Sequence, residues 1–164
     1  MILLITGVLE RNGLREAATD LIKKVKGATA GKVVAAYGIM RGIFAAFNVG
    51  FGGVAGFVRP VVLPMAEAAV KNQGHEAKEE HVEDIKGMAS AMENFTWFFW
   101  QVLFVGGSGG ILVQSTLASL GYEVELIELA AAEIPVAVFA LIVSCAMTLM
   151  TDKKLTRKYY GENK

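Results

Sequence analysis

Three charged side chains stand within or beside apolar stretches of the sequence, where a charge is costly. Arg41 lies inside the apolar run that follows Lys32, Arg59 ends that run, and Glu67 is the lone acid in LPMAEAAV. In hydrocarbon such a group must face a partner or a watery cavity. Glu67 could therefore pair with Arg59 or Arg41, or carry a proton. The alternative for the two arginines is that they extend to a membrane interface.

Two glycine clusters interrupt apolar runs of the sequence. The first follows Asn48 and comprises Gly50, Gly52, Gly53 and Gly56, and the second is GGSGG at 106–110. A membrane helix breaks only where its freed backbone groups line a cavity or a buried site, so the two clusters point to a substrate held between half-helices. The spacing of Gly52 to Gly56 and of Gly106 to Gly110 also suits close helix packing, and both interpretations stay open.

The sequence matches parts of two enzyme motifs, but the other residues that these motifs need are not in the required positions. GGSGG fits the nucleophile pattern of hydrolases, but both histidines, His75 and His81, precede the serine instead of following it. A zinc-binding helix places its two histidines four residues apart, whereas six residues separate these two. We therefore expect HEAKEEH to form a solvated charged loop, and we expect no enzyme activity, no metal site and no cofactor.

Composition indicates a membrane protein and argues against a nucleic-acid partner. The 164 residues are 54% hydrophobic with a mean hydropathy of +0.45, and 16 basic side chains balance 16 acidic ones. No basic stripe is interleaved with aromatic residues, as nucleic-acid binding requires. The single cysteine, Cys145, is interpreted as a packing residue.

Three blocks, 42–58, 94–120 and 134–151, carry no Asp, Glu, Lys, Arg or His. Each approaches or exceeds the length that a membrane-spanning helix needs, roughly 17 to 25 residues. The sequence therefore predicts a single all-α membrane domain with broken apolar segments at 33–58 and 94–120 and a transmembrane helix at 134–151. An amphipathic helix is expected at 10–32, a helix and charged connection at 60–93, and a basic tail at 152–164. Trp97 and Trp100 are interpreted as an aromatic belt.

Loop charges predict the sidedness of these segments. Six Lys or Arg at 11–32 and the basic tail indicate the cytoplasm, while 121–133, with four Glu and no basic residue, indicates the outer side. Two cytoplasmic ends require an even number of crossings. The segment 33–58 is therefore expected to enter and return as a hairpin that turns at the glycines, which leaves 71–93 cytoplasmic; a displaced short helix at 61–72 is the alternative.

Three stretches carry a resemblance to a known family: LERNGL at 9–14, ATAGK at 28–32 and VRPVVLPMAEAA at 58–69. Over nearly its whole length the chain resembles the first of two paired bacterial membrane families, the domain-of-unknown-function 969 family, now described as subunits of a 5-oxoproline (pyroglutamate) transporter. The resemblance implies a permease subunit that acts with a sister membrane subunit and is similar to half of an ion-transporter-superfamily permease. It also implies membrane segments before Met1, and MILLITGVLE looks like the end of such a span.

The chain departs from the family pattern at two places. Val54 follows Gly52-Gly53 where a Gly-Gly-His pattern is expected, and Trp100-Gln101 stands where an acidic pair is expected. The resemblance therefore does not imply ion or proton coupling through these positions, and the choice of coupling ion, H⁺ or Na⁺, stays open.

On the residues and the resemblance together, we expect a multi-pass plasma-membrane permease subunit for a small carboxylate such as 5-oxoproline. Half-helix ends would offer N–H groups to the carboxylate, and an arginine would add charge. The predicted substrate-binding residues are Arg41, Asn48, Gly50, Gly52, Gly53, Arg59, Glu67, Asn94, Gly107, Ser108 and Gly109. The alternatives are a non-transporting membrane scaffold and a soluble helical domain.

Overall fold

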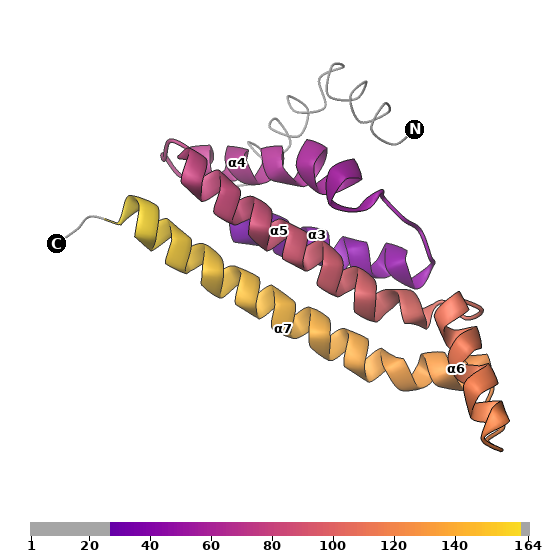
Figure 1. Cartoon of the computed structure of the whole chain (residues 1–164). Coiled ribbons are helices and arrows are strands. Elements are labelled where there is room, and N and C mark those ends of the chain that lie inside the picture. The colour runs from indigo at the N-terminus through magenta and orange to yellow at the C-terminus, as the bar shows by residue number, and fades with distance from the viewer. Residues whose placement is uncertain (1–26, 162–164) are drawn as a thin grey trace.

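The computed structural model describes residues 27–161, and every regular element in that range is a helix (Figure 1). The all-α prediction is confirmed for this range, whereas most of the helix predicted at 10–32 lies outside it. With the labels of Figure 1, the elements are α3 (Ala30–Ala46), η1 (Val54–Val62), α4 (Leu63–Asn72), α5 (Glu79–Trp100), η2 (Gln101–Leu103), α6 (Ser108–Ser119) and α7 (Leu126–Tyr160).

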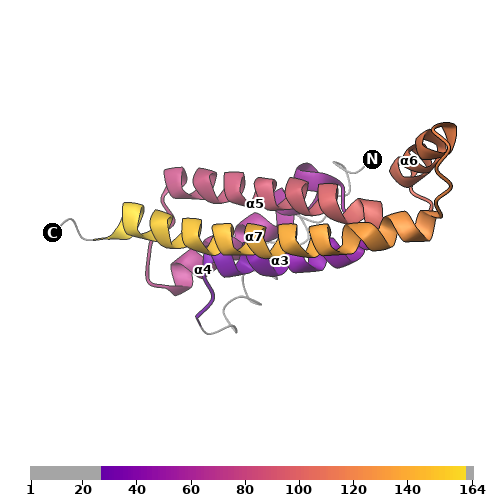
Figure 2. The same cartoon turned by 90° about the horizontal axis from the view of Figure 1, so that it is seen from below.

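Three long helices, α3, α5 and α7, pack side by side and form the body of the bundle (Figures 1 and 2). Figure 1 shows that α3 and α5 run in one direction, while α7 and the pair η1–α4 run in the other. The apolar core lies where α3, η1–α4 and α5 meet, and Val34, Val58, Ala66 and Ile85 are fully buried there. The helix α6 projects from the end of this body and packs mainly on α7.

The first glycine cluster ends α3 and turns the chain back on itself. The helix begins with Thr29, whose side chain accepts a hydrogen bond from the amide of Lys32, as a helix N-cap does. It ends at Ala46, and the turn that follows uses positive φ at Asn48, Gly52 and Gly53. The chain then returns along η1 and α4, so α3 and η1–α4 form a helical hairpin. The end predicted at residue 32 for the helix 10–32 is wrong, because α3 begins at Ala30 and continues through Gly31 and Lys32.

The returning helix starts as a π-helix because it contains Pro60. Proline has no N–H, and its ring clashes with the carbonyl four residues earlier in an α-helix. In η1 the hydrogen bonds are wider, and the amide of Leu63 donates to the carbonyl of Val58, five residues earlier. The segment then tightens into α4. The sequence predicts a helix after Pro60, but it does not predict the π-helix that contains Pro60.

The charged connection predicted at 71–93 is mostly helical. Only residues 73–78 separate α4 from α5, and α5 runs without a break from Glu79 through the aromatic run to Trp100. The prediction that HEAKEEH forms a solvated loop is wrong at its end, since His81 lies on α5 and is only 1% exposed. The charged residues of this segment were interpreted as a loop because most of them occupy the exposed face of an amphipathic helix.

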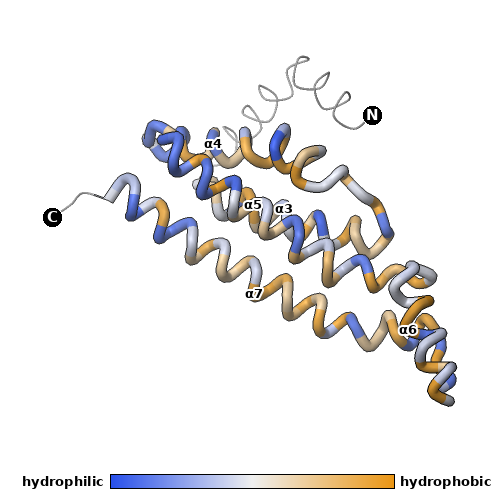
Figure 3. Tube along the Cα trace, in the orientation of Figure 1, coloured by the Kyte–Doolittle hydropathy of each residue, from blue (hydrophilic) through white to orange (hydrophobic). Residues whose placement is uncertain are grey.

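One helix of the described range, α7, is long and apolar enough by itself to cross a membrane. It contains the predicted span 134–151 but begins earlier, because Glu125 and Glu128 form a capping box before it. The helices α5–η2 and α6 also pass this test together, with a bend of 53° at the second glycine cluster. Large apolar side chains on α3, α5, α6 and α7 are exposed. Figure 3 shows hydrophilic residues gathered where the α4–α5 connection meets the end of α7.

Candidate functional site

A buried ion pair joins α3 to α5. Nε of Arg41 donates to Oε2 of Glu93 at 2.7 Å, and the hydroxyl of Tyr37 donates to the same oxygen. Arg41 is 2% exposed and Glu93 is 3% exposed. Two charges are stable at such burial only when they are paired and hydrogen-bonded, and here both conditions hold.

Aromatic rings and the first glycine turn enclose the guanidinium. Its carbon lies 4.3 Å from the ring centroid of Trp97 and 5.5 Å from that of Phe51, so both rings offer their negative faces to the charge. Nη1 of Arg41 donates to the carbonyl of Val49 at 3.2 Å. The ring of Phe51 also packs on Phe44, at 4.9 Å between centroids. The turn is thereby held against the arginine.

Two glycines of α3 bring the helices close enough to bury the pair. A side chain at Gly38 would collide with Met92 of α5, and one at Gly42 would come within 3.0 Å of the ring of Trp100. The indole of Trp100 donates to the carbonyl of Ala137 at 3.1 Å, which ties α5 to α7 at the same level. Both tryptophans thus contact the bundle, which their interpretation as an aromatic belt did not anticipate.

The site retains hydrogen-bond donors that no described residue uses. The guanidinium of Arg41 has five N–H groups, and Glu93 and Val49 accept from two of them. Within residues 27–161, Nε2 of His81 is the one fully enclosed side-chain polar atom without a partner, so Nη2 of Arg41, which donates to no described residue, is not fully enclosed. The amides of residues 50–53 likewise donate to no described residue. The site can therefore accept an anion beside Arg41.

The structure brings some predicted residues to this site. Arg41 is its centre, and Asn48, Gly50, Gly52 and Gly53 belong to the turn whose Val49 and Phe51 contact the guanidinium. Asn48 itself is exposed and has a φ of 57°, so its observed role is to shape the turn.

The other predicted residues lie elsewhere. Arg59 is exposed on η1, and Glu67 is half-buried on α4. Neither forms an ion pair with a described residue, so the predicted pairing of Glu67 with Arg41 or Arg59 is wrong. Asn94 follows Glu93 but is exposed, since the next residue of a helix points about 100° away.

The second glycine cluster stands apart from the ion pair. Gly107 precedes α6, and both Ser108 and Gly109 are exposed in its first turn. Gly106 has a φ of 91° and would meet nothing within 4 Å if it carried a side chain. It therefore serves the turn, while close contacts between the described helices are made by Gly31, Gly38 and Gly42.

Glu93 and Tyr37 are the site residues that the sequence analysis missed. Each belongs to a pair spaced by four residues, Tyr37 with Arg41 and Glu93 with Trp97, which places both members on one face of a helix. Glu93 is also the last acid before the uncharged block 94–120. An acid at that position can serve as the partner of Arg41. Because it lies just outside the uncharged block, the block does not mark it as a buried residue.

A second polar cluster lies at the opposite end of the bundle. Nδ1 of His81 lies 3.0 Å from the hydroxyl oxygen of Tyr160, whose ring stacks on His75 at 4.3 Å between centroids. His81 belongs to the charged first turn of α5, outside its apolar part. Burial lowers the pKa of His81, and the nearby Asp152 and Asp84 offset part of that effect. These contacts fasten the α4–α5 connection to the end of α7.

No metal centre is formed within residues 27–161, where no three or more His, Cys, Asp or Glu side chains are grouped to hold an ion. The guanidinium of the Arg41–Glu93 pair is a group that can bind an anion.

Comparison with known proteins identifies one family. A family model described as "Protein of unknown function (DUF969)" matches residues 1–156. No curated protein and no solved structure shows a significant match. Because the family model covers nearly the whole sequence, the chain belongs to the DUF969 family of proteins of unknown function.

Proposed function

We propose that this chain is a subunit of a membrane permease that carries a small carboxylate such as 5-oxoproline and acts with a sister membrane subunit. The observation that supports this most is the enclosed pair of Arg41 and Glu93 beside a glycine-rich turn, in a bundle with an apolar outer surface. A purely structural ion pair has no need of free donors around it. Here the amides of residues 50–53, which belong to the turn whose Val49 accepts from Arg41, donate to no described residue.

The substrate carboxylate binds to two kinds of donor at this site. Arginine holds carboxylates through two parallel hydrogen bonds. The start of η1 adds backbone N–H groups and the positive end of a helix dipole. In the empty site Glu93 neutralises Arg41, and the substrate competes with Glu93 for the guanidinium. This exchange leaves the buried carboxylate of Glu93 without its cationic partner, so that charge must be neutralised in another way.

Glu93 is the candidate group for proton coupling, in place of Glu67. Its carboxylate accepts from both Tyr37 and Arg41, so substrate binding at Arg41 removes its main stabilising charge. A proton carried with the substrate would neutralise the carboxylate that is left without its cationic partner.

The distribution of charge along the bundle supports a membrane-spanning arrangement. The α4–α5 connection meets the end of α7 through Lys78, whose Nζ donates to the carbonyl of Tyr159 at 2.8 Å. In the first turns of α5, Asp84 pairs with Lys158 of α7 at 3.2 Å. The acidic segment 121–133 lies at the other end (Figure 1). With the basic end in the cytoplasm, α3 and η1–α4 form the predicted hairpin, and α5–α6 and α7 are two further crossings.

Uptake into proteoliposomes tests the proposed function. Vesicles that contain both this chain and the sister-family protein of the same genome should accumulate labelled 5-oxoproline, and vesicles with either subunit alone should not. Unlabelled pyrrolidinone, which has the same ring without the carboxylate, should not compete, because it offers nothing for Arg41 to bind. Full competition by pyrrolidinone would contradict the role of the carboxylate.

The same experiment distinguishes transport from a scaffold. If the sister subunit alone transports 5-oxoproline at the rate of the pair, this chain is an assembly subunit and the ion pair is structural. If vesicles with both subunits and vesicles with the sister subunit alone all fail to accumulate 5-oxoproline, the proposed substrate is wrong.

A further inference from the structure

The last turn of α7 is held on the α4–α5 connection through its two final tyrosines. The hydroxyl of Tyr160 lies 3.0 Å from Nδ1 of His81 and accepts from the amide of Lys78 at 3.4 Å, while its ring stacks on His75. The ring of Tyr159 stacks on His81 at 5.1 Å between centroids, and its carbonyl accepts from Nζ of Lys78. These five residues, His75, Lys78, His81, Tyr159 and Tyr160, are called the α7 latch.

His81 is the most enclosed member of the latch. It is 1% exposed, and its Nε2 is fully enclosed and has no partner among residues 27–161. It lies four residues before Ile85, which is fully buried in the apolar core, so both side chains share one face of α5. His75 is only half-buried, and Lys78 is exposed. The imidazole of His81 therefore closes this end of the core.

A charged His81 ring does not fit the closed latch. In the neutral ring, Nδ1 can accept from the hydroxyl of Tyr160 or donate to it, whereas in the charged ring both nitrogens must donate. The N–H at Nε2 would then be enclosed without an acceptor. A buried charge that lacks hydrogen bonds is costly, and the same charge in water is solvated. Protonation therefore favours a state in which the ring of His81 meets water.

The charged groups around the latch do not supply the missing acceptor. Besides the latch residues, the groups that act on the charge of His81 are Asp84 of α5 and Asp152 and Lys158 of α7. Asp84 already accepts from Tyr159 at 2.8 Å and from Lys158 at 3.2 Å. Asp152 is buried nearby, but it does not bond to Nε2. The effect of burial on His81 therefore exceeds the attraction of the two acids.

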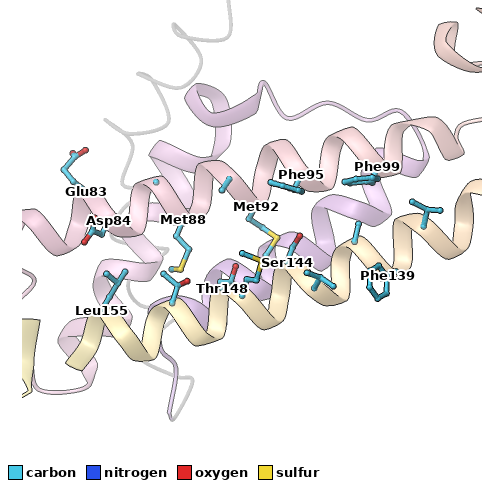
Figure 4. Close-up of a pocket in the computed structure, with 17 residues that line it drawn as sticks. Glu83, Asp84, Met88, Met92, Phe95, Phe99, Phe139, Ser144, Thr148 and Leu155 are labelled. Carbon is cyan, nitrogen blue, oxygen red and sulfur yellow. The ribbon is translucent and has the colours of Figure 1, made fainter. Parts of the chain in front are cut away.

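The surroundings of the latch allow it to open locally. A groove of about 610 Å³ runs between α5 and α7, and Figure 4 shows Asp84 and Leu155 on its two walls at the end next to the latch. The ion pair of Asp84 with Lys158 is largely exposed, and such pairs hold weakly. At the other end of α5, Trp100 ties the helix to Ala137. The last turn of α7 can therefore leave α5 while the far contact stays intact.

We propose that the α7 latch is a pH-sensitive switch. It holds the last turn of α7 on the α4–α5 connection while His81 is neutral, and it releases that turn when His81 binds a proton. The core formed by α3, η1–α4 and α5 stays folded in both states, so the release is a local opening. The proposal does not depend on the proposed function.

Amide hydrogen exchange of the full chain in detergent tests the switch. Rates of the unmodified chain and of His81→Gln are compared at the same pH, which cancels the intrinsic effect of pH on exchange. For residues 157–161 the ratio of the two rates should rise about five- to tenfold from about pH 7.5 to pH 5.5, because one unit below the ordinary histidine pKa of 6.5 a proton favours the open state by about tenfold at most. For residues 34–45 of α3 the ratio should change less than about twofold.

His75→Gln is the matched control. Because no ring nitrogen of His75 is fully enclosed without a partner, a charge on this ring can be solvated in the closed latch. The His75→Gln chain should therefore show the same rise relative to His81→Gln as the unmodified chain does.

A second measurement needs no substitution at His81. The chain has two histidines, so ¹³C-labelled histidine gives two ring signals in the NMR spectrum, and His75→Gln assigns them. The signal of His81 should titrate below pH 6.5 in the unmodified chain. In Tyr160→Ala, which opens the latch, its titration should move up toward that value.

Three results would overturn the proposal. An equal rise of the exchange ratio in residues 157–161 and 34–45 would show a loss of global stability in place of a local opening. A ratio that falls in acid would show that charged His81 pairs with Asp152 and tightens the latch. An unchanged ratio, with His81 titrating at the same pH in the unmodified chain and in Tyr160→Ala, would show that the latch does not respond to this proton.

Discussion

Arg41 is the residue on which the chemistry of the site depends. Its charge is balanced by Glu93, and its planar group is held between two rings and a backbone carbonyl. Such a pair adds little net stability, because desolvation offsets the attraction, but loss of one partner leaves an uncompensated buried charge. The pair is therefore sensitive to substitution whatever its function.

Glu93→Gln should destabilise the isolated chain in detergent by about 3–5 kcal/mol, the usual cost of breaking a buried ion pair. Tyr37→Phe removes one hydrogen bond to the carboxylate and should cost less, about 1–3 kcal/mol. Denaturant unfolding followed by circular dichroism measures both. Glu67→Gln is the control, since Glu67 has no ion pair among the described residues, and it should change stability by less than about 0.5 kcal/mol. Equal effects of Glu93→Gln and Glu67→Gln would contradict the importance of the pair.

At the residue scale the sequence predicts which charge is special but not its partner. Arg41 stands out because an arginine in an apolar run needs a counter-charge. Glu93 is separated from it by 52 residues, and their contact depends on how α3 packs against α5. No local pattern determines that packing, so the sequence offers the nearer acid Glu67 as one possible partner and does not indicate Glu93.

The helices approach one another at glycines, and this makes the packing specific. An added Cβ at Gly31 would lie 2.5 Å from Cβ of Asp152, on the contact between α3 and α7. In contrast, Gly87 lies within α5, and an added Cβ there would meet nothing within 4 Å.

Gly31→Ala should therefore lower the thermal midpoint of the isolated chain, because α3 and α7 must separate to make room, at a typical cost of about 1–3 kcal/mol for overpacking. Gly87→Ala should raise it or leave it unchanged, since alanine favours a helix by up to about 1 kcal/mol. Differential scanning fluorimetry of both variants in the same detergent compares them. A Gly31→Ala chain as stable as Gly87→Ala would mean that α3 and α7 do not touch there.

The histidine contacts at the end of α7 should make stability depend on pH. Because burial lowers the pKa of His81 below its usual 6.5, the unfolded chain binds the proton more readily than the folded one. This contribution is complete above pH 6.5 and is lost as the pH falls below that value. Between about pH 7.5 and pH 5.5 the thermal midpoint should fall further for the unmodified chain than for His81→Gln. Parallel pH profiles of the two proteins would show that His81 is not enclosed in solution.

At the element scale the sequence predicts the existence of helices better than their limits. The apolar blocks and the glycine breaks predict α3, α6 and the core of α7. The many charges at 79–93 predict a connection, but they occupy the exposed face of the amphipathic first part of α5. The predicted span begins at 134, whereas α7 begins at Leu126, where Glu125 and Glu128 form a capping box. The π-helix around Pro60 follows from proline geometry in the packed hairpin, which the sequence alone does not show.

At the scale of the whole molecule, the bundle separates its charge between two ends. Lys78 of the α4–α5 connection contacts Tyr159 at the end of α7, and the acidic 121–133 segment lies at the far end. The proposed orientation places the first end in the cytoplasm and the second outside.

Labelling of single cysteines in intact cells tests this orientation. In a Cys145→Ser background, Tyr122→Cys should react with an impermeant maleimide from outside, whereas Lys78→Cys should react only after the cells are opened. Both positions are exposed, so access to the reagent decides the result. Labelling of both positions from the same side would contradict the proposed arrangement.

The claim that Arg41 binds the transported carboxylate is tested most directly by transport measurements on complexes with a substitution at Arg41 or at Arg59. Lysine keeps the charge of Arg41 but loses the planar fork that fits a carboxylate and stacks on Trp97. Proteoliposomes with both subunits should therefore lose at least tenfold in 5-oxoproline uptake with Arg41→Lys, and less than twofold with Arg59→Lys at an exposed position. Unchanged uptake with Arg41→Lys would contradict the claim that this buried arginine binds the transported carboxylate.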